Sequence, residues 1–261
     1  SMLVDFGPDQ PRLMLGRATP DMPWSMQEPV RGVVEATAVQ KLLTAVNNLQ
    51  ARVFLPRGTD PKACDLRTDG LRVTVQGAAD KQPTTVRLGA DFDKNGEQLT
   101  YAMRAEGLTE VVGVPRGAVN EIRRPWTDYL PLRIFTILDQ VTRLDRVAGD
   151  GSTRRLRRDD NGVWVDDKSA KVDSELIADA VDHIRDLTGK KALLARTLHG
   201  EPNWTLLLAR TNDPDGVGSF GNLEVWDEND KPLVVRNRSG LKDVAFELSP
   251  ISSGILRGLW K

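Results

Sequence analysis

The sequence is poor in the residues that build metal and redox centres: 261 residues contain one cysteine and two histidines. With Cys64 alone the chain cannot form an internal disulfide, which fits the cytosol and also a bacterial periplasm, where disulfides are permitted but not required. Two histidines and one cysteine cannot complete a standard zinc site without carboxylates. This scarcity argues against a structural zinc centre.

The chain also lacks an excess of charge and a long apolar run. Lys and Arg number 36 and Asp and Glu 37, for a net charge of −1, so we expect no nucleic-acid partner. No run of eighteen apolar residues occurs, and the first residues lack the pattern of a signal peptide. Because Ser1-Met2 is typical of a cloning remnant, we expect any signal or membrane anchor to lie upstream of Leu3.

What the sequence does contain is a repeat. Residues 34–55, VEATAVQKLLTAVNNLQARVFL, return without a gap as residues 172–193, VDSELIADAVDHIRDLTGKKAL, at an offset of 138. Apolar residues stand at the same places in both copies, among them Val39 and Ile177, Leu43 and Val181, Val46 and Ile184, and Leu49 and Leu187. Their spacing of three and four residues predicts one amphipathic helix in each copy, with its apolar face buried against a sheet.

Short strands are predicted around each helix in matching order. Before the helices come 3–6, 12–17 and 24–26, and then 141–147, 153–158 and 163–165, with Trp24 and Trp164 in equivalent places. After the helices come 71–75, 86–89, 99–103 and 111–114, and then 204–209, 223–226, 232–236 and 244–248, at an offset that drifts to 133. Asp173 is the expected N-cap of the second helix. Asn161-Gly162 favours a type I′ hairpin turn.

This pattern predicts an α+β protein made by tandem duplication of a unit with a mainly antiparallel sheet packed by one amphipathic helix. The units are expected at 1–130 and 131–261. Each should end in a short helical piece carrying Trp126 or Trp260. The segment YLPLRIFTIL, residues 129–138, is too apolar for a flexible tether, so we expect unit two to be docked on unit one.

Two such units, each with a Trp just before the helix and a ladder of strands after it, resemble the DUF4340 family of uncharacterised bacterial proteins over nearly the whole chain. Members of that family are typically extracytoplasmic parts of membrane-anchored proteins, some linked to ABC transport systems of the gliding-motility kind. The resemblance implies no catalytic residues. The family's N-terminal membrane segment is missing from this sequence, so the expected extracytoplasmic location leaves the cytoplasm as an open alternative.

Two loops match known ligand-binding patterns. Asp91, Asp93 and Asn95, followed by Gly96, have the spacing of the first half of a calcium loop. The twelfth position, which should be a Glu, is Ala102, so an ordinary hairpin turn is the favoured interpretation and a weak calcium site the alternative. Residues 216–221 spell G-x-G-x-x-G, but a strand follows where a phosphate site needs a helix, so we interpret them as a hairpin loop.

The remaining candidates favour structural roles. Arg154, Arg155, Arg157 and Arg158 lie close to Asp159, Asp160, Asp166 and Asp167, and cross-strand pairing explains them better than nucleic-acid binding. His183 is expected at the edge of the core, His199 in a loop, and Cys64 is expected to be an inert thiol.

These observations predict a non-enzymatic extracytoplasmic scaffold or binding module of a membrane-associated assembly, with a protein partner. The alternative is an unrecognised hydrolase that uses carboxylates, with or without a cation, between the two units. No cofactor other than the weak calcium is expected, and membrane contact only through an upstream segment.

Overall fold

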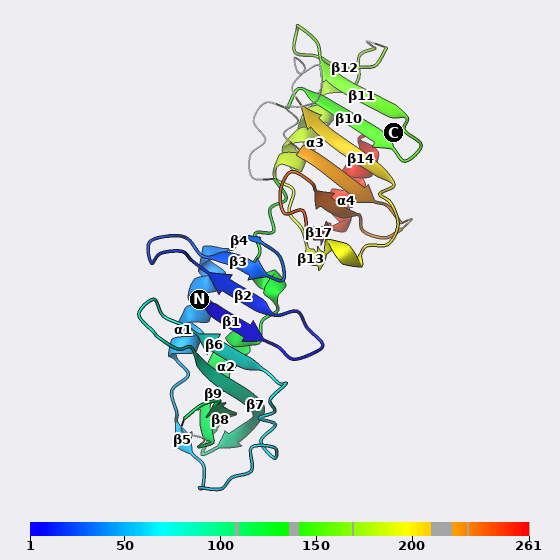
Figure 1. Cartoon of the computed structure of the whole chain (residues 1–261). Coiled ribbons are helices and arrows are strands. Elements are labelled where there is room, and N and C mark those ends of the chain that lie inside the picture. The colour runs from blue at the N-terminus through cyan, green and yellow to red at the C-terminus, as the bar shows by residue number, and fades with distance from the viewer. Residues whose placement is uncertain (108–109, 136–140, 169, 210–220, 229, 261) are drawn as a thin grey trace. The chain divides into compact units, whose positions relative to one another are not determined.

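A computed structural model describes residues 1–107, 110–135, 141–168, 170–209, 221–228 and 230–260. The chain divides into two compact units, Ser1–Pro131 and Leu132–Lys261, here called unit 1 and unit 2 (Figure 1). The boundary falls inside the apolar segment 129–138. Tyr129 and Leu130 are buried in the last part of unit 1, and Ile134 and Phe135 are buried in the first part of unit 2. The docking of one unit on the other stays a prediction.

The described part of unit 1 forms a nine-stranded antiparallel sheet with two α-helices. Across the sheet the strand order is β4-β3-β2-β1-β6-β7-β8-β9-β5. The elements are β1 (Met2–Asp5), β2 (Leu13–Gly16), β3 (Ser25–Glu28), β4 (Gly32–Val33), α1 (Ala36–Asn47), β5 (Val53–Phe54), β6 (Arg72–Val75), β7 (Thr84–Lys94), β8 (Glu97–Arg104), β9 (Val112–Pro115), α2 (Arg116–Ile122) and the 3₁₀ turn η1 (Trp126–Tyr129).

In unit 2 the described residues form an eight-stranded antiparallel sheet in the order β12-β11-β10-β14-β15-β16-β17-β13. The elements are β10 (Arg143–Ala148), β11 (Thr153–Arg158), β12 (Trp164–Asp166), α3 (Ser174–Arg185), β13 (Lys191–Leu194), the 3₁₀ turn η2 (Ala195–Thr197), β14 (Trp204–Ala209), β15 (Gly221–Trp226), β16 (Val234–Asn237), β17 (Val244–Glu247) and α4 (Pro250–Gly258).

Apart from β4, the two sheets have the same strand order. Strands β3-β2-β1-β6 of unit 1 correspond to β12-β11-β10-β14, and β7-β8-β9-β5 correspond to β15-β16-β17-β13. Helices α1 and α3 are both twelve residues long and begin at Ala36 and Ser174, which are 138 residues apart. The predicted α+β class with two similar units is confirmed.

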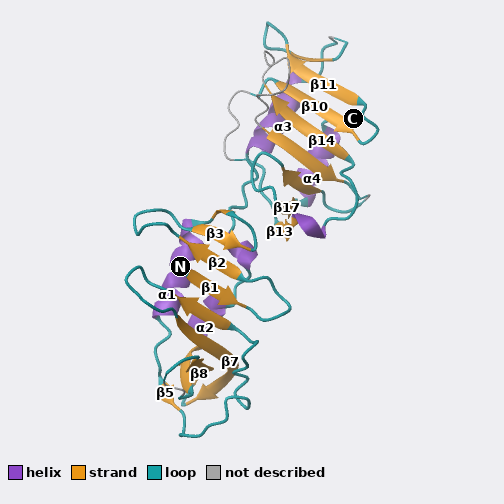
Figure 2. Ribbon diagram, viewed as in Figure 1, coloured by secondary structure: helices purple, strands orange, loops and turns teal. Residues whose placement is uncertain are grey.

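The core of each unit lies between its sheet and its helices, which stand behind the sheet in the view of Figure 2. In unit 1, Val39 and Leu42 of α1 and Val119 of α2 are almost completely buried. In unit 2, Ile177 and Ile184 of α3 have the same role. The helices therefore bury the apolar face that their three- and four-residue spacing predicts.

The ends of the repeated helices differ in one respect. The Asp173 carboxylate accepts the amides of Glu175 and Leu176, both at 3.1 Å, which confirms the predicted N-cap of α3. Glu35 stands at the same place before α1 and makes no side-chain cap. A side chain one methylene longer than Asp does not close this short ring here, so α1 begins with its first amides uncapped by Glu35.

The predicted type I′ turn at Asn161-Gly162 is wrong. Such a turn needs positive φ at both central residues, and only Gly162, at φ 77°, has it. The Asp159 carboxylate instead accepts the amides of Asn161 and Val163, both at 2.9 Å, and holds a longer loop. The two-residue turn between β7 and β8 does have positive φ at both positions, 54° at Asn95 and 80° at Gly96.

No helix in the described part of the chain is long and apolar enough to cross a membrane.

Candidate functional site

The predicted calcium-binding residues lie on the β7–β8 hairpin of unit 1. Asp91 and Asp93 are on strand β7, and Asn95 forms its turn. The Asp91 carboxylate accepts a hydrogen bond from Thr100 Oγ1 at 2.6 Å and another from Arg123 Nη1 at 3.0 Å. These contacts engage both carboxylate oxygens of Asp91.

Arginines surround the two carboxylates. Arg116, the first residue of α2, donates to Asp93 at 3.0 Å and lies 3.5 Å from Asp91. Burial raises the pKa of Asp91, but the hydrogen bonds from Arg123 and Thr100 and the two arginine charges outweigh burial and leave the pKa below its ordinary value. Asp91 is therefore a carboxylate paired with protein cations. Calcium binding here stays the untested alternative to an ordinary hairpin turn.

Unit 2 has a similar link at the corresponding place. Arg257 of α4 donates to Asp227, just after β15, from Nη2 at 2.6 Å and from Nε at 3.0 Å. In both units, therefore, an arginine of the last α-helix forms an ion pair with an aspartate on, or just after, the first strand of a hairpin, β7 in unit 1 and β15 in unit 2. A contact kept in both copies is most simply structural.

The other predicted candidates have packed or hydrogen-bonded surroundings. Cys64 is buried beside Leu66 and Met103, and burial, with a smaller contribution from the charge of Asp60, raises the pKa of its thiol. A raised thiol pKa lowers the fraction of nucleophilic thiolate. His183 Nε2 lies 3.2 Å from Ser252 Oγ, which links α3 to α4, and His199 is exposed. Within the described ranges no three His, Cys, Asp or Glu side chains group to hold a metal.

The predicted pairing of the β11 arginines with the following aspartates is wrong for three of the four. Arg155 pairs with Asp145 of β10, with Nε 2.8 Å from Oδ1, Arg158 lies over the Trp164 ring at 5.4 Å, and Arg154 donates to the Trp260 carbonyl. Asp159, Asp166 and Asp167 instead accept hydrogen bonds from backbone amides.

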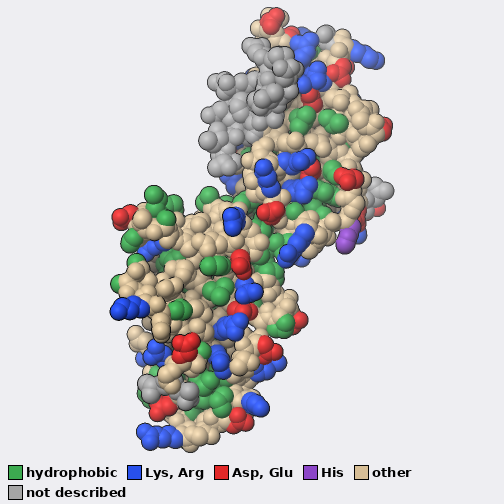
Figure 3. Space-filling model, in the orientation of Figure 1, with side chains coloured by type: hydrophobic (Ala, Val, Ile, Leu, Met, Phe, Trp, Pro, Cys, Tyr) green, Lys and Arg blue, Asp and Glu red, His purple; other side chains and the backbone are tan. Residues whose placement is uncertain are grey.

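Charges of both signs are interspersed over the visible face of each unit (Figure 3).

In unit 2, Asp145 is 3% exposed, and its carboxylate lies between Arg143 and Arg155. Burial raises its pKa, but the hydrogen bonds and charges of the two arginines outweigh burial and leave the pKa below its ordinary value. Glu224 and Arg236 form a similar pair on β15 and β16, with Nε 2.6 Å from Oε2.

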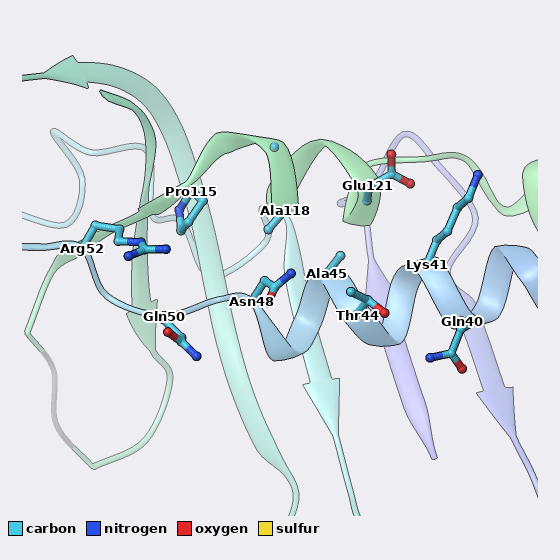
Figure 4. A pocket seen from close by; sticks show the side chains of 11 residues that line it. Gln40, Lys41, Thr44, Ala45, Asn48, Gln50, Arg52, Pro115, Ala118 and Glu121 are labelled. Carbon is cyan, nitrogen blue, oxygen red and sulfur yellow. The ribbon is translucent and has the colours of Figure 1, made fainter. Parts of the chain in front are cut away.

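A groove of about 650 Å³ runs between α1 and α2 in unit 1 (Figure 4). Ala45 and Ala118 form part of its lining, and Lys41 and Glu121 lie at one end. The small side chains of Ala45 and Ala118 leave space between the two helices, so the packing of the helices is enough to explain the groove. Among the described residues, no lining group is a buried polar atom without a partner.

A second cavity, here called the unit 2 pocket, has a volume of about 390 Å³. It lies where strands β10 and β14 meet the end of α4. Its described lining is Arg146, Trp204, Asp227, Asp230, Leu256, Arg257 and Trp260. The Arg146 guanidinium lies over the Trp204 ring, 5.0 Å from its centroid. Asp227 and Arg257 form the ion pair described above, so part of the pocket wall is already neutralised.

Three donors at this pocket have no acceptor among the described residues. Arg146 Nε, Trp204 Nε1 and Trp260 Nε1 are buried and make no hydrogen bond within the part of the chain that the structure describes. The two tryptophans are 4% and 5% exposed. A buried donor without a partner costs about 1–3 kcal/mol. Three such unsatisfied donors around one cavity are unusual, because most buried polar groups in proteins are hydrogen-bonded.

The duplication shows what unit 1 has in the same place. Arg17 lies over Trp24 at 5.0 Å, as Arg158 lies over Trp164, so this shared cation–π pair aligns the two copies. Arg17 and Arg158 are thus equivalent, and the residues four positions before them, Leu13 and Arg154, correspond to each other. The residues directly opposite them on the neighbouring strands are Val4 and Arg146.

Unit 2 therefore carries two arginines where unit 1 carries a buried apolar pair. Val4 and Leu13 are both 0% exposed, whereas Arg146 and Arg154 face each other across two strands. Like charges directly opposite destabilise a sheet. Trp204 likewise stands where unit 1 has Leu71, as the pairing of β1 with β6 and of β10 with β14 shows. A broken packing rule in one copy alone is expected at a functional site.

Sequence analysis missed this site, although a signal was present. The strand RLMLGR of unit 1 aligns with TRRLRR of unit 2, and the arginine at 154 falls on the side of the strand that carries Leu156. Comparing the two copies for apolar positions that become charged would have found Arg154 and, through pairing, Arg146. The G-x-G-x-x-G of residues 216–221 lies outside the described residues except for its last glycine.

The chain was compared with known proteins in three ways: no family model matches it, and neither a curated protein nor a solved structure shows significant similarity to it.

Proposed function

We propose that this protein is a non-enzymatic binding module whose ligand site is the unit 2 pocket. The observation that carries the proposal is the replacement of the apolar pair Val4 and Leu13 by Arg146 and Arg154 in an otherwise similar sheet. Unit 1 shows that the fold accepts apolar residues at these positions. The fold therefore does not require arginines at these positions.

We place this module in an extracytoplasmic, membrane-associated assembly, where a partner protein contacts it. Support comes from the resemblance to DUF4340 proteins and from the tandem duplication, which supplies a second sheet-and-helix unit as a partner surface. Determining the natural reading frame tests this part. A frame that begins at Met2 with no hydrophobic segment before it would remove the basis for the membrane association.

A fragment screen by ligand-observed NMR tests the binding function. The wild type is compared with the double variant Arg146→Val, Trp204→Leu, which gives unit 2 the residues that unit 1 has at these positions. We expect a set of fragments that bind the wild type and not the variant. Equal binding by both proteins would contradict the proposal. Hydrolysis of a chromogenic ester or phosphate by the wild type, lost in the variant, would instead favour the hydrolase.

A further inference from the structure

We infer that the unit 2 pocket binds a small oxyanion, a carboxylate or phosphate group, and this inference rests on the binding function proposed above. The groups that lack partners there are all donors. An indole N–H can only donate, and a guanidinium only donates and is always charged. A ligand that pairs with these donors must therefore supply acceptor atoms, and the oxygens of a carboxylate or phosphate do so.

Two arginines balance two aspartates among the described lining residues, and Arg146 is the arginine without a carboxylate partner. Asp227 already neutralises Arg257 through two hydrogen bonds to one carboxylate oxygen. In the described residues Arg146 has no carboxylate partner, and Arg154, directly opposite on the next strand, gives its hydrogen bond to the Trp260 carbonyl. An anion at Arg146 would relieve the repulsion between the two arginines. Arg also binds carboxylate and phosphate in bidentate fashion, which Lys does not.

The pocket also limits the size of the anion. Asp230 lies in the lining and is exposed. Its carboxylate repels an extended polyanion more strongly than a single carboxylate or phosphate group, because the polyanion carries more negative charge. The cavity of about 390 Å³ has room for such a group with a small body attached. A nucleic-acid strand does not fit this description.

Binding requires a small local movement. Arg146 Nε and the two indole nitrogens have almost no contact with solvent, and the Arg146 guanidinium lies over the Trp204 ring. Side chains of the pocket must therefore shift before oxygens can reach these donors. Since this changes the surroundings of an indole, binding should change the tryptophan fluorescence of the protein.

The test is a titration of the full chain with acetate, acetamide and inorganic phosphate at constant ionic strength set with chloride. Tryptophan fluorescence and thermal unfolding are followed. Acetate and acetamide have nearly the same shape and differ in charge, so comparing them tests for an anion. Comparing phosphate with acetate shows whether the site prefers a phosphate or a carboxylate group. We expect a saturable fluorescence change and a rise in melting temperature with acetate or phosphate, and neither with acetamide.

Variants locate the effect. Arg146→Val should weaken anion binding about tenfold or more, the loss expected for a charge-assisted bidentate contact. Trp204→Phe removes one indole donor and keeps an aromatic ring, so it should weaken binding even if Arg146→Val folds poorly. Arg158→Val, which changes the cation–π pair shared with unit 1, should leave the dissociation constant within about twofold.

The possible failures are distinct. If acetamide binds as well as acetate and Arg146→Val loses both, the pocket is a binding site but the inference of an anion is wrong. If no probe binds, or if Arg146→Val and Trp204→Phe respond to anions as the wild type does, the anion inference is overturned. The fragment screen then decides separately whether the pocket binds anything.

Discussion

Replacing Arg146 by Val should stabilise unit 2 in the absence of a bound anion. The substitution puts into β10 the residue that stands at the same place in β1, where Val4 is fully buried. It removes a buried donor without a partner, worth about 1–3 kcal/mol, and the repulsion from Arg154 across the strand pair, worth about 0.5 kcal/mol.

One term opposes this gain and another nearly cancels. The cation–π contact with Trp204, at 5.0 Å, is lost, at a cost of about 1 kcal/mol. The apolar stem of Arg and the side chain of Val have similar numbers of carbon atoms, so their burial nearly cancels. The net expectation is a gain of about 1 kcal/mol in the free energy of unfolding of unit 2, which for a unit of this size raises its melting temperature by about 4 °C.

Calorimetry and urea unfolding of the full chain, in buffer with chloride as its small anion, measure the change. Arg158→Val is the matched control, because it removes a cation–π contact that both units share, over Trp164 in this unit. We expect it to lose about 0.5–1 kcal/mol. A loss of more than about 1 kcal/mol in Arg146→Val would refute the reasoning, since it would mean that Arg146 stabilises the sheet as it stands.

Three further predictions concern the structural parts of the chain. Asp173→Ala should cost about 1 kcal/mol and Glu35→Asp should add a similar amount, since of the two repeated helices α3 has a side-chain cap and α1 has none; equal urea midpoints for wild type and variants would contradict this. Unit 2 should lose stability as pH falls below about 4, because the folded pKa of Asp145 lies below its unfolded value. The stability that the ionised carboxylate contributes above the unfolded pKa is lost as the carboxylate protonates. In Asp145→Asn, unfolding followed by circular dichroism should depend less on pH in this acid range. Millimolar calcium should leave the melting temperature unchanged, because arginines and Thr100 occupy the Asp91 oxygens; a rise that Asp91→Asn abolishes would instead support the calcium loop.

Local patterns were enough to predict most of the elements. The spacing of apolar residues located α1 and α3, because a helix buries every third or fourth residue whatever its partner is. Alternation located the strands before and after them. The turn at Asn95-Gly96 was recognised, yet the strand before it is longer than a calcium loop allows, since Asp91 and Asp93 pair across the sheet with Thr100 and Gln98.

Long-range pairings were beyond the sequence. The prediction of one helix over each repeated segment was too long. Helices α1 and α3 end at Asn47 and Arg185, and strands β5 and β13 follow where the helices were expected to continue. The pairing of these strands with β9 and β17 depends on where each sheet ends. The unit 2 pocket combines residues of β10, β14 and the chain beyond α4. No local spacing relates Arg146 to Trp260, and only the fold brings them to one cavity.

The edge pairings of β5 with β9 and of β13 with β17 have a consequence for folding. In each unit the strand that follows the first helix finds its partner only when the last strand has been made, as Phe54 with Val112 and Lys191 with Glu247 show. Such pairings raise the contact order and slow folding. On the ribosome, unit 1 can close its sheet before most of unit 2 is synthesised. We expect this order of synthesis to reduce strand exchange between the two similar units, a common error in folding of multidomain proteins.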